Sequence, residues 1–211
     1  MKRLFFLFIL FISSIEINAQ WSISPEIGIA SVKRNDFGDS WGTGIKAGLG
    51  VGYQFQTNLG LKTGLYYATR GYSLGAAFGH YEYPSDDYFH ELAFENKLRR
   101  NFLQLPIMLN YSLPLSKDVT FNFAAGPYLG VSVKDYWTGG YYTEEHDKSV
   151  FDGLRAFDWG VSATAGIDVH NWIMSVGYDL SLGKEDKSSG INANYHSMSF
   201  NFGYKFSFPG K

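Results

Sequence analysis

The segment TGIKAGLGVGYQFQTNLGLKTGLYYATRG, residues 43–71, alternates between two kinds of side chain. Every second residue of 43–55 and of 59–67 is apolar, aromatic or threonine, and the residues between them are mostly glycine. The basic residues of this second set are Lys46, Lys62 and Arg70. Because successive side chains of a strand point to opposite faces, this period of two predicts two long strands joined by a tight turn at residues 56–58.

Six further segments repeat the alternation, which gives eight predicted strands in all. They are residues 21–30, 101–111, 119–131, 157–169, 172–181 and 196–208. Short turns follow the second, fourth and sixth strands, and longer polar loops follow the first, third, fifth and seventh. This layout is typical of outer-membrane barrels, which have short turns on the periplasmic side and longer loops outside. Pro25 has no N–H to donate, so we expect an irregularity in the first strand.

The loops after the third and fifth strands are predicted to be large. Residues 73–98 combine glycine, proline, aromatic and acidic residues, and we expect an exposed loop with a short helical turn at 91–98. Residues 134–155 form the other large loop. The aromatic residues of the two loops are a candidate binding surface, and their packing on the barrel rim is the alternative. They are Tyr81, Tyr83, Tyr88, Tyr136, Trp137, Tyr141 and Tyr142.

Alternation fits a membrane barrel with its apolar face outward, and also a soluble barrel, such as a lipocalin, with its apolar face inward. The strands reach the roughly 9–11 residues of a tilted membrane strand. Their polar face is rich in small residues, which suit the crowded interior of eight strands. It also carries charges of both signs, which suit paired groups in a narrow lumen: Glu26, Lys46, Lys62, Arg70, Asp158, Asp168, Asp179 and Lys205. We therefore predict an all-β fold, an eight-stranded antiparallel up-and-down transmembrane β-barrel.

Residues 1–19 have the layout of a signal peptide. Lys2 and Arg3 precede an apolar run at 4–12, and Ala19 is a small residue at the expected cleavage site. The alternative is a membrane anchor, but the run is shorter than the roughly 20 residues that a spanning helix needs. We therefore predict a cleaved signal peptide, residues 1–19, and an outer-membrane β-barrel domain, residues 20–211, located in the cell outer membrane.

Composition excludes several classes of function and partner. The 211 residues include no cysteine, which excludes disulfides and thiolate metal sites, and the net charge of −2 without a basic run excludes nucleic acid as a partner. Aromatic residues recur where strands meet the short turns, as in an interfacial girdle: Trp21, Tyr53, Phe55, Tyr111, Trp172 and Phe208. The final strand resembles the signal read by the barrel-assembly machinery. We expect that machinery and the outer-membrane lipids, lipopolysaccharide included, as partners.

No group of residues has the spacing of a catalytic or metal site. His80, His90 and His146 lie among acidic residues in predicted loops, but their spacing matches no EF-hand or zinc motif. His170 falls in a tight turn, and His196 lies on the outward face near the outer rim. A nucleophile needs a base within reach and an acid to orient that base, and the sequence reveals no such set. We predict no catalytic, cofactor-binding or metal-binding residue, and no enzyme activity.

The strand NFLQLPIMLNY, residues 101–111, resembles a strand of the PorT-like outer-membrane β-barrel proteins. AGPYLG at 125–130, FDWG at 157–160 and GYKF at 203–206 resemble three further strands of that family. The resemblance spans nearly the whole mature chain and implies a porin-like barrel. The family's namesake acts in the type IX secretion system, a role that these residues do not assign to this chain. We expect a structural or binding role in the envelope, with attachment to a secretion complex as one form of it. A small-solute porin and a lipid-modifying enzyme are the alternatives.

Overall fold

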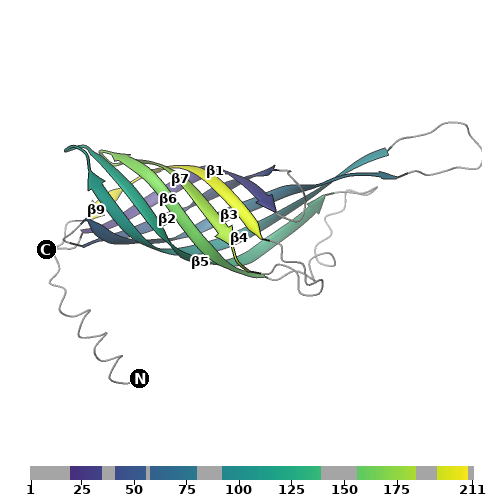
Figure 1. Cartoon of the computed structure of the whole chain (residues 1–211), viewed down its shortest axis with the longest axis horizontal. Helices are drawn as coiled ribbons and strands as arrows, with labels where there is room; N and C mark the ends of the chain where they lie inside the picture. Colours follow the sequence, from purple (N-terminus) through teal and green to yellow (C-terminus); the bar gives the residue numbers. More distant parts are fainter. Residues whose placement is uncertain are drawn as a thin grey trace, which may run out of the picture.

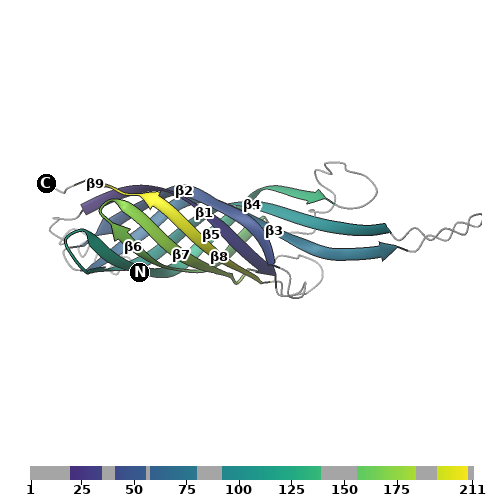
Figure 2. The same cartoon turned by 90° about the horizontal axis from the view of Figure 1, so that it is seen from above.

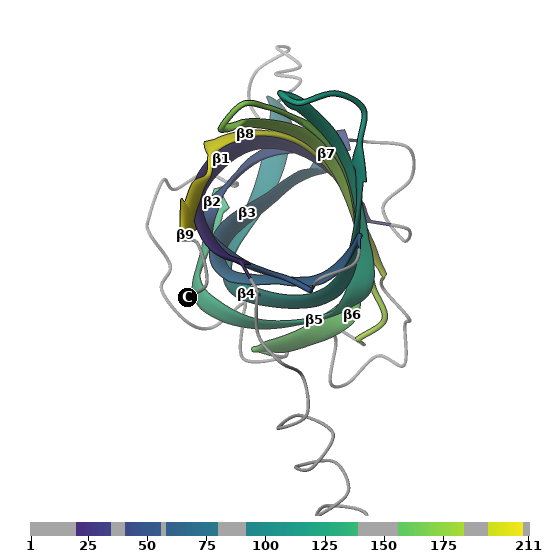
Figure 3. The same cartoon turned by 90° about the vertical axis from the view of Figure 1, so that its left-hand side faces the viewer.

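The computed structural model describes residues 20–34, 41–55, 58–79, 92–138, 156–183 and 194–208. These residues form a closed antiparallel barrel (Figures 1 and 3). Each strand pairs with the next along the chain, and β1 pairs with both β2 and β8, which closes the wall. The predicted eight-stranded up-and-down barrel is confirmed. The strands are β1 Gln20–Arg34, β2 Trp41–Gln54, β3 Leu59–Gly79, β4 Leu92–Pro114, β5 Val119–Thr138, β6 Phe157–Val169, β7 Trp172–Ser181, β8 Tyr195–Tyr204 and β9 Phe206–Phe208.

The eighth predicted strand is divided into β8 and β9, both of which pair with β1 in one continuous register. The ladder stops at Glu26 opposite Gly203 and resumes at Ile23 opposite Phe206. Pro25 lies in this gap, while on its other side the ladder to β2 continues without a shift. The irregularity expected at Pro25 is therefore confirmed on the β8 side, where a residue without an N–H leaves the ladder incomplete.

The apolar side chains point away from the barrel axis. Ile29 of β1, Leu65 of β3 and Phe200 of β8 are each more than half exposed, and the residue that follows each of them on the other face is buried. Leu105 also faces outward. An apolar exterior around a polar interior is the arrangement of a membrane barrel and the reverse of a lipocalin.

Glycine lets a large aromatic ring lie against the inner wall. A Cβ added to Gly48 would lie 2.8 Å from Cδ1 of Tyr66, and one added to Gly64 would lie 2.8 Å from Cε2 of the same ring. The Tyr66 ring therefore lies over Gly48 of β2 and Gly64 of β3, two positions that have no side chain. This is how the small residues predicted for the inner face relieve its crowding.

The expectation of a large loop at 73–98 with a helical turn at 91–98 is wrong. β3 continues to Gly79 and β4 begins at Leu92, and the two strands pair up to Gly79 opposite Leu92, with one irregularity between Ser73 and Ala76. β2 pairs with β3 only as far as Ala68, so the β3–β4 ladder runs on beyond the wall (Figures 1 and 2). The loop expected to begin at residue 134 is likewise shorter, because β5 extends to Thr138.

Several predicted features lie outside the described residues. They are the signal peptide at 1–19 and most of the long loops. Within the described ranges, no helix is long and apolar enough to cross a membrane.

The aromatic girdle predicted at the short-turn end of the barrel is confirmed. Trp21 meets Tyr53 with ring centroids 4.7 Å apart, and Tyr53 in turn meets Phe55 at 5.2 Å. Trp172 and Tyr204, on β7 and β8, are 4.9 Å apart. Clustered amphipathic rings at one level of the outer wall mark a membrane interface.

Candidate functional site

The eight charged residues predicted for the polar face all point into the lumen, where they form four ion pairs. The pairing that the sequence predicts in general terms, including inward-facing Lys46 and Lys62 beside carboxylates, is confirmed. The four cations and four carboxylates sum to zero, so these eight groups carry no net charge. The pairs are Lys62–Glu26 at 3.1 Å, Lys46–Asp179 at 2.8 Å, Arg70–Asp158 at 2.7 Å, and Lys205–Asp168.

The Arg70–Asp158 pair is the centre of a larger network. Asp158 accepts hydrogen bonds from Nη1 of Arg70 at 2.7 Å, from the Tyr128 hydroxyl at 2.9 Å and from the Ser181 hydroxyl at 2.5 Å. The Arg70 guanidinium lies 4.5 Å from the centroid of the Phe102 ring. The side chains of the pair are 3% and 9% exposed. A buried network with this many satisfied partners is rigid, and it joins strands β3, β5, β6 and β7 across the lumen.

A second network crosses the lumen at Lys46 and Asp179. The Asp179 carboxylate accepts a hydrogen bond from Nζ of Lys46 at 2.8 Å and another from the Ser162 hydroxyl. The Lys46 ammonium also lies 5.6 Å from the centroid of the Tyr66 ring. β2, β3, β6 and β7 thus each contribute one side chain to a bridge between separate parts of the wall.

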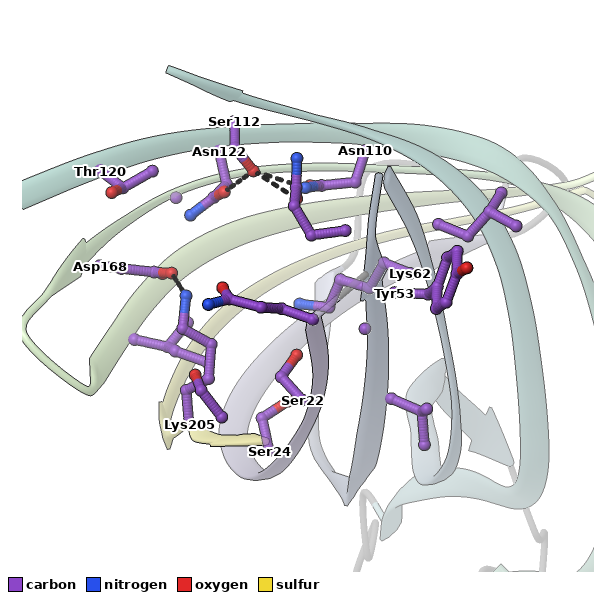
Figure 4. A pocket seen from close by; sticks show the side chains of 18 of the residues that line it. Ser22, Ser24, Tyr53, Lys62, Asn110, Ser112, Thr120, Asn122, Asp168 and Lys205 are labelled. Atoms are coloured by element: carbon purple, nitrogen blue, oxygen red, sulfur yellow. Dashed lines mark hydrogen bonds and ion pairs between the residues drawn. The ribbon is translucent and has the colours of Figure 1, made fainter. Parts of the chain in front are cut away.

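Below these networks, a polar cavity of about 420 Å³ lies at the short-turn end of the barrel (Figure 4). Lys62 and Ser24 line it, and both bind Glu26 behind them. The Ser112 hydroxyl donates to Oδ1 of Asn122 at 2.8 Å, and Asn110 donates to Ser112 at 2.9 Å. Its remaining lining combines further hydroxyl and amide side chains with the Lys205–Asp168 ion pair and several apolar residues, which suits water and small polar molecules.

Sequence reasoning missed Arg100 and Gln104 as interior residues of interest. Arg100 is 2% exposed and lies 5.0 Å from the Phe102 ring centroid, but it falls between the predicted loop, which ends at residue 98, and the predicted strand, which begins at residue 101. The predicted alternation of residues 101–111 puts Gln104 on the inward face, where the structure has it, but does not single it out. Its fully buried amide has no hydrogen-bond partner within the described protein, and buried groups of this kind are commonly satisfied by internal water.

A family model for the outer membrane protein beta-barrel domain matches residues 17–187. The chain belongs to this family. Membership places the protein in the outer membrane, and it agrees with the apolar exterior and charged lumen described above. The match does not show that the chain is one of the PorT-like proteins in particular. No curated protein matches the sequence.

Several solved outer-membrane barrels are similar to the chain at low identity. Ail, the attachment invasion locus protein of Yersinia pestis, is 14% identical over 90% of this chain and 100% of that one, with a TM-score of 0.45. Neisserial surface protein A is 14% identical over 88% and 97% of the two chains, with a TM-score of 0.45. OprG of Pseudomonas aeruginosa is 10% identical over 92% and 97%, with a TM-score of 0.45.

The two described histidines lie far from the lumen networks. His170 has a φ of 56° in the β6–β7 turn, and its Nε2 is 3.6 Å from the Asp118 carboxylate in an exposed contact. His196 faces outward as predicted, and its Nδ1 is 2.5 Å from the Tyr178 hydroxyl. Within the described ranges, no three His, Asp or Glu side chains are grouped so that they could hold a metal ion.

The other candidate residues lie outside the described ranges or in β5. His80, His90 and His146 lie outside them. Of the aromatic loop set, Tyr136 and Trp137 belong to the end of β5. The remaining members, Tyr81, Tyr83, Tyr88, Tyr141 and Tyr142, lie outside the described residues, so the binding surface stays a prediction.

Proposed function

We propose that this chain is a non-conducting outer-membrane barrel with a structural or binding role in the envelope. The observation that carries the proposal is the pair of ionic networks across the lumen, centred on Arg70–Asp158 and on Lys46–Asp179. Both are buried, and both join strands from separate parts of the wall. A barrel whose lumen is filled in this way is rigid and offers no path for solutes. Its binding or structural role would therefore be carried out by its outer surface and its two ends.

The alternative of a small-solute porin draws support from the polar cavity at the short-turn end. The networks above that cavity argue against it. Recording from the purified protein in planar bilayers tests the choice: we expect no steady unit conductance above the leak of the bare bilayer. Regular channel steps that depend on the amount of protein would overturn the proposal in favour of a porin.

The expected partners follow from position in the envelope. The resemblance of residues 101–111, 125–130 and 157–160 to PorT-like proteins favours attachment to a larger envelope or secretion complex. Chemical crosslinking in intact cells, followed by mild solubilisation and mass spectrometry, tests this part. We expect one or more envelope proteins crosslinked in fixed ratio to the barrel. Recovery of the barrel without any reproducible protein neighbour would contradict it.

A lipid-modifying enzyme would require a nucleophile, a base and an orienting acid to converge at a rim. His196 instead has its Nδ1 against a phenol, which is not an arrangement that activates serine. We therefore assign no catalytic residue and expect no turnover. Incubation of the reconstituted barrel with labelled outer-membrane lipids, followed by mass spectrometry, tests this expectation, and any time-dependent product would overturn it.

A further inference from the structure

The polar cavity at the short-turn end is lined by two ammonium groups. They belong to Lys62 of β3 and to Lys205, between β8 and β9 (Figure 4). The two lysine side chains are 21% and 28% exposed, whereas the carboxylate partners, Glu26 and Asp168, are only 7% and 8% exposed. In each pair the ammonium is therefore the more accessible group. Because an ammonium has three N–H donors, each lysine can bind a further acceptor while it holds its carboxylate.

A chain of hydrogen bonds adds a third donor to the lining. Asn110 donates to Ser112 at 2.9 Å, and Ser112 donates to Oδ1 of Asn122 at 2.8 Å. The chain ends in Nδ2 of Asn122, an amide nitrogen that can only donate. Asn122 belongs to β5, so the three donors come from separate parts of the wall and surround the cavity (Figure 4).

One buried hydroxyl of the lining has no partner. Ser175 of β7 is 6% exposed, and its Oγ has no hydrogen-bond partner within the described part of the chain. Most buried hydroxyls are satisfied, because an unsatisfied one costs free energy. The position of the Ser175 hydroxyl depends on a single staggered torsion, so it can turn toward a molecule in the cavity. A polar ligand would satisfy it.

The cavity has the size and the access of a small-molecule site. Its volume of about 420 Å³ lies within the range of ligand pockets, about 300–1,000 Å³. Gln20 and Ser207 line it near the ends of β1 and β9, and both are exposed, so the cavity can be reached from the short-turn end. In outer-membrane barrels this end meets the periplasm.

We propose that the cavity binds a small dicarboxylate from the periplasm, with one carboxylate on Lys62 and the other on Lys205. A carboxylate has two acceptor oxygens, so one of the two groups can also accept from Nδ2 of Asn122. Hydrogen bonds between an ammonium and a carboxylate are charge-assisted, which makes them stronger than bonds between neutral groups.

The charges around the cavity favour carboxylates over phosphate. Glu26 and Asp168 lie directly behind the two ammonium groups. A phosphate would bring more negative charge close to these carboxylates than a single carboxylate group does, and like charges repel. The inference goes beyond the function proposed above, because it concerns this cavity alone and holds whether or not the lumen conducts.

Isothermal titration calorimetry of the purified barrel in detergent micelles, with glutarate as the probe, tests the site. We expect saturable binding of glutarate at least tenfold tighter than that of butyrate, which has only one carboxylate. Dimethyl glutarate has the same carbon chain without the charges and should not bind. The proposal would be overturned by absence of glutarate binding, by equal affinity for butyrate or the diester, or by tighter binding of inorganic phosphate.

Variants locate the binding. Lys62→Met and Lys205→Met should each weaken glutarate binding at least tenfold, the effect of one lost charge-assisted hydrogen bond. Lys117→Met is the matched control and should bind as wild type does, because Lys117 is exposed in the β4–β5 turn at the same end and does not line the cavity. An equal loss in Lys117→Met would overturn the proposal, and so would wild-type affinity in either cavity variant with folded electrophoretic mobility.

A double variant separates the loss of the ammonium from the effect of an unpaired carboxylate. Glu26→Gln combined with Lys62→Met removes both charges of one pair and leaves the lumen groups neutral in sum. We expect it to bind glutarate at least tenfold more weakly than wild type, because the donor to the ligand is still missing. Wild-type affinity in this folded double variant would overturn the proposal.

Discussion

Replacing Arg70 with methionine tests whether the lumen networks stabilise the barrel. Methionine keeps a long apolar side chain over the Phe102 ring, 4.5 Å from the original guanidinium, but it leaves the Asp158 carboxylate without its cation. Removing one partner of a buried ion pair costs about 3–5 kcal/mol. Two hydroxyls still donate to Asp158, so we expect the lower end, about 3 kcal/mol of unfolding free energy. Equilibrium unfolding in urea from lipid vesicles, followed by tryptophan fluorescence, measures the loss.

The design includes a compensating variant and a matched control. Adding Asp158→Asn to Arg70→Met removes the unpaired carboxylate charge, and the double variant should recover at least about 1 kcal/mol of the lost unfolding free energy. Lys205→Met removes the same kind of charge at the open end of the cavity, where the Lys205 side chain is 28% exposed, and should cost less than about 1 kcal/mol. If Arg70→Met costs no more than Lys205→Met, or if the double variant is no more stable than Arg70→Met, the reasoning about burial is refuted.

Three other changes address the outer wall, the inner wall and the lumen. Leu105→Arg places a charge on the lipid face and should cost about 2–4 kcal/mol in vesicle unfolding, more than Leu105→Ala; equal costs would contradict the assigned face. Gly48→Leu should cost at least about 1–3 kcal/mol, because its Cβ would lie 2.2 Å from the Leu65 carbonyl oxygen; a neutral effect by the same assay would show that the wall can shift there. Truncating Arg70, Tyr128 and Asp158 together to alanine should raise bilayer conductance above wild type, and an unchanged leak would show that other groups block the lumen.

Strand phase could be read from the sequence, whereas the partner of each lumen charge could not. Alternation places Lys46 inside because its neighbours on the strand are apolar. Its partner Asp179 is 133 residues away, and the two meet only because the barrel closes at a particular register. Local sequence carries little information on that register, so only the general expectation of paired charges was available.

The extension of β3 and β4 escaped sequence analysis for a different reason. Alternation arises where one face of a strand meets lipid and the other meets the lumen. A ladder outside the membrane has no lipid-facing side, so its sequence need not alternate, and residues 73–79 pair with 92–98 beyond the end of the β2–β3 ladder. The segment LAFENKL at 92–98 even contains good helix formers, but pairing along β3 overrides that local preference. Arg100, at the edge of this segment, was missed with it.

The direction of the side chains along one strand tests the central claim most directly. The chain has no cysteine, so single cysteines can be introduced without background at positions 174 to 179 of β7 and labelled with a fluorophore. In vesicles of brominated lipid, we predict strong quenching at positions 174, 176 and 178 and weak quenching at 175, 177 and 179. Quenching without this alternation, or with its phase reversed, would contradict a barrel whose apolar side chains face the lipid.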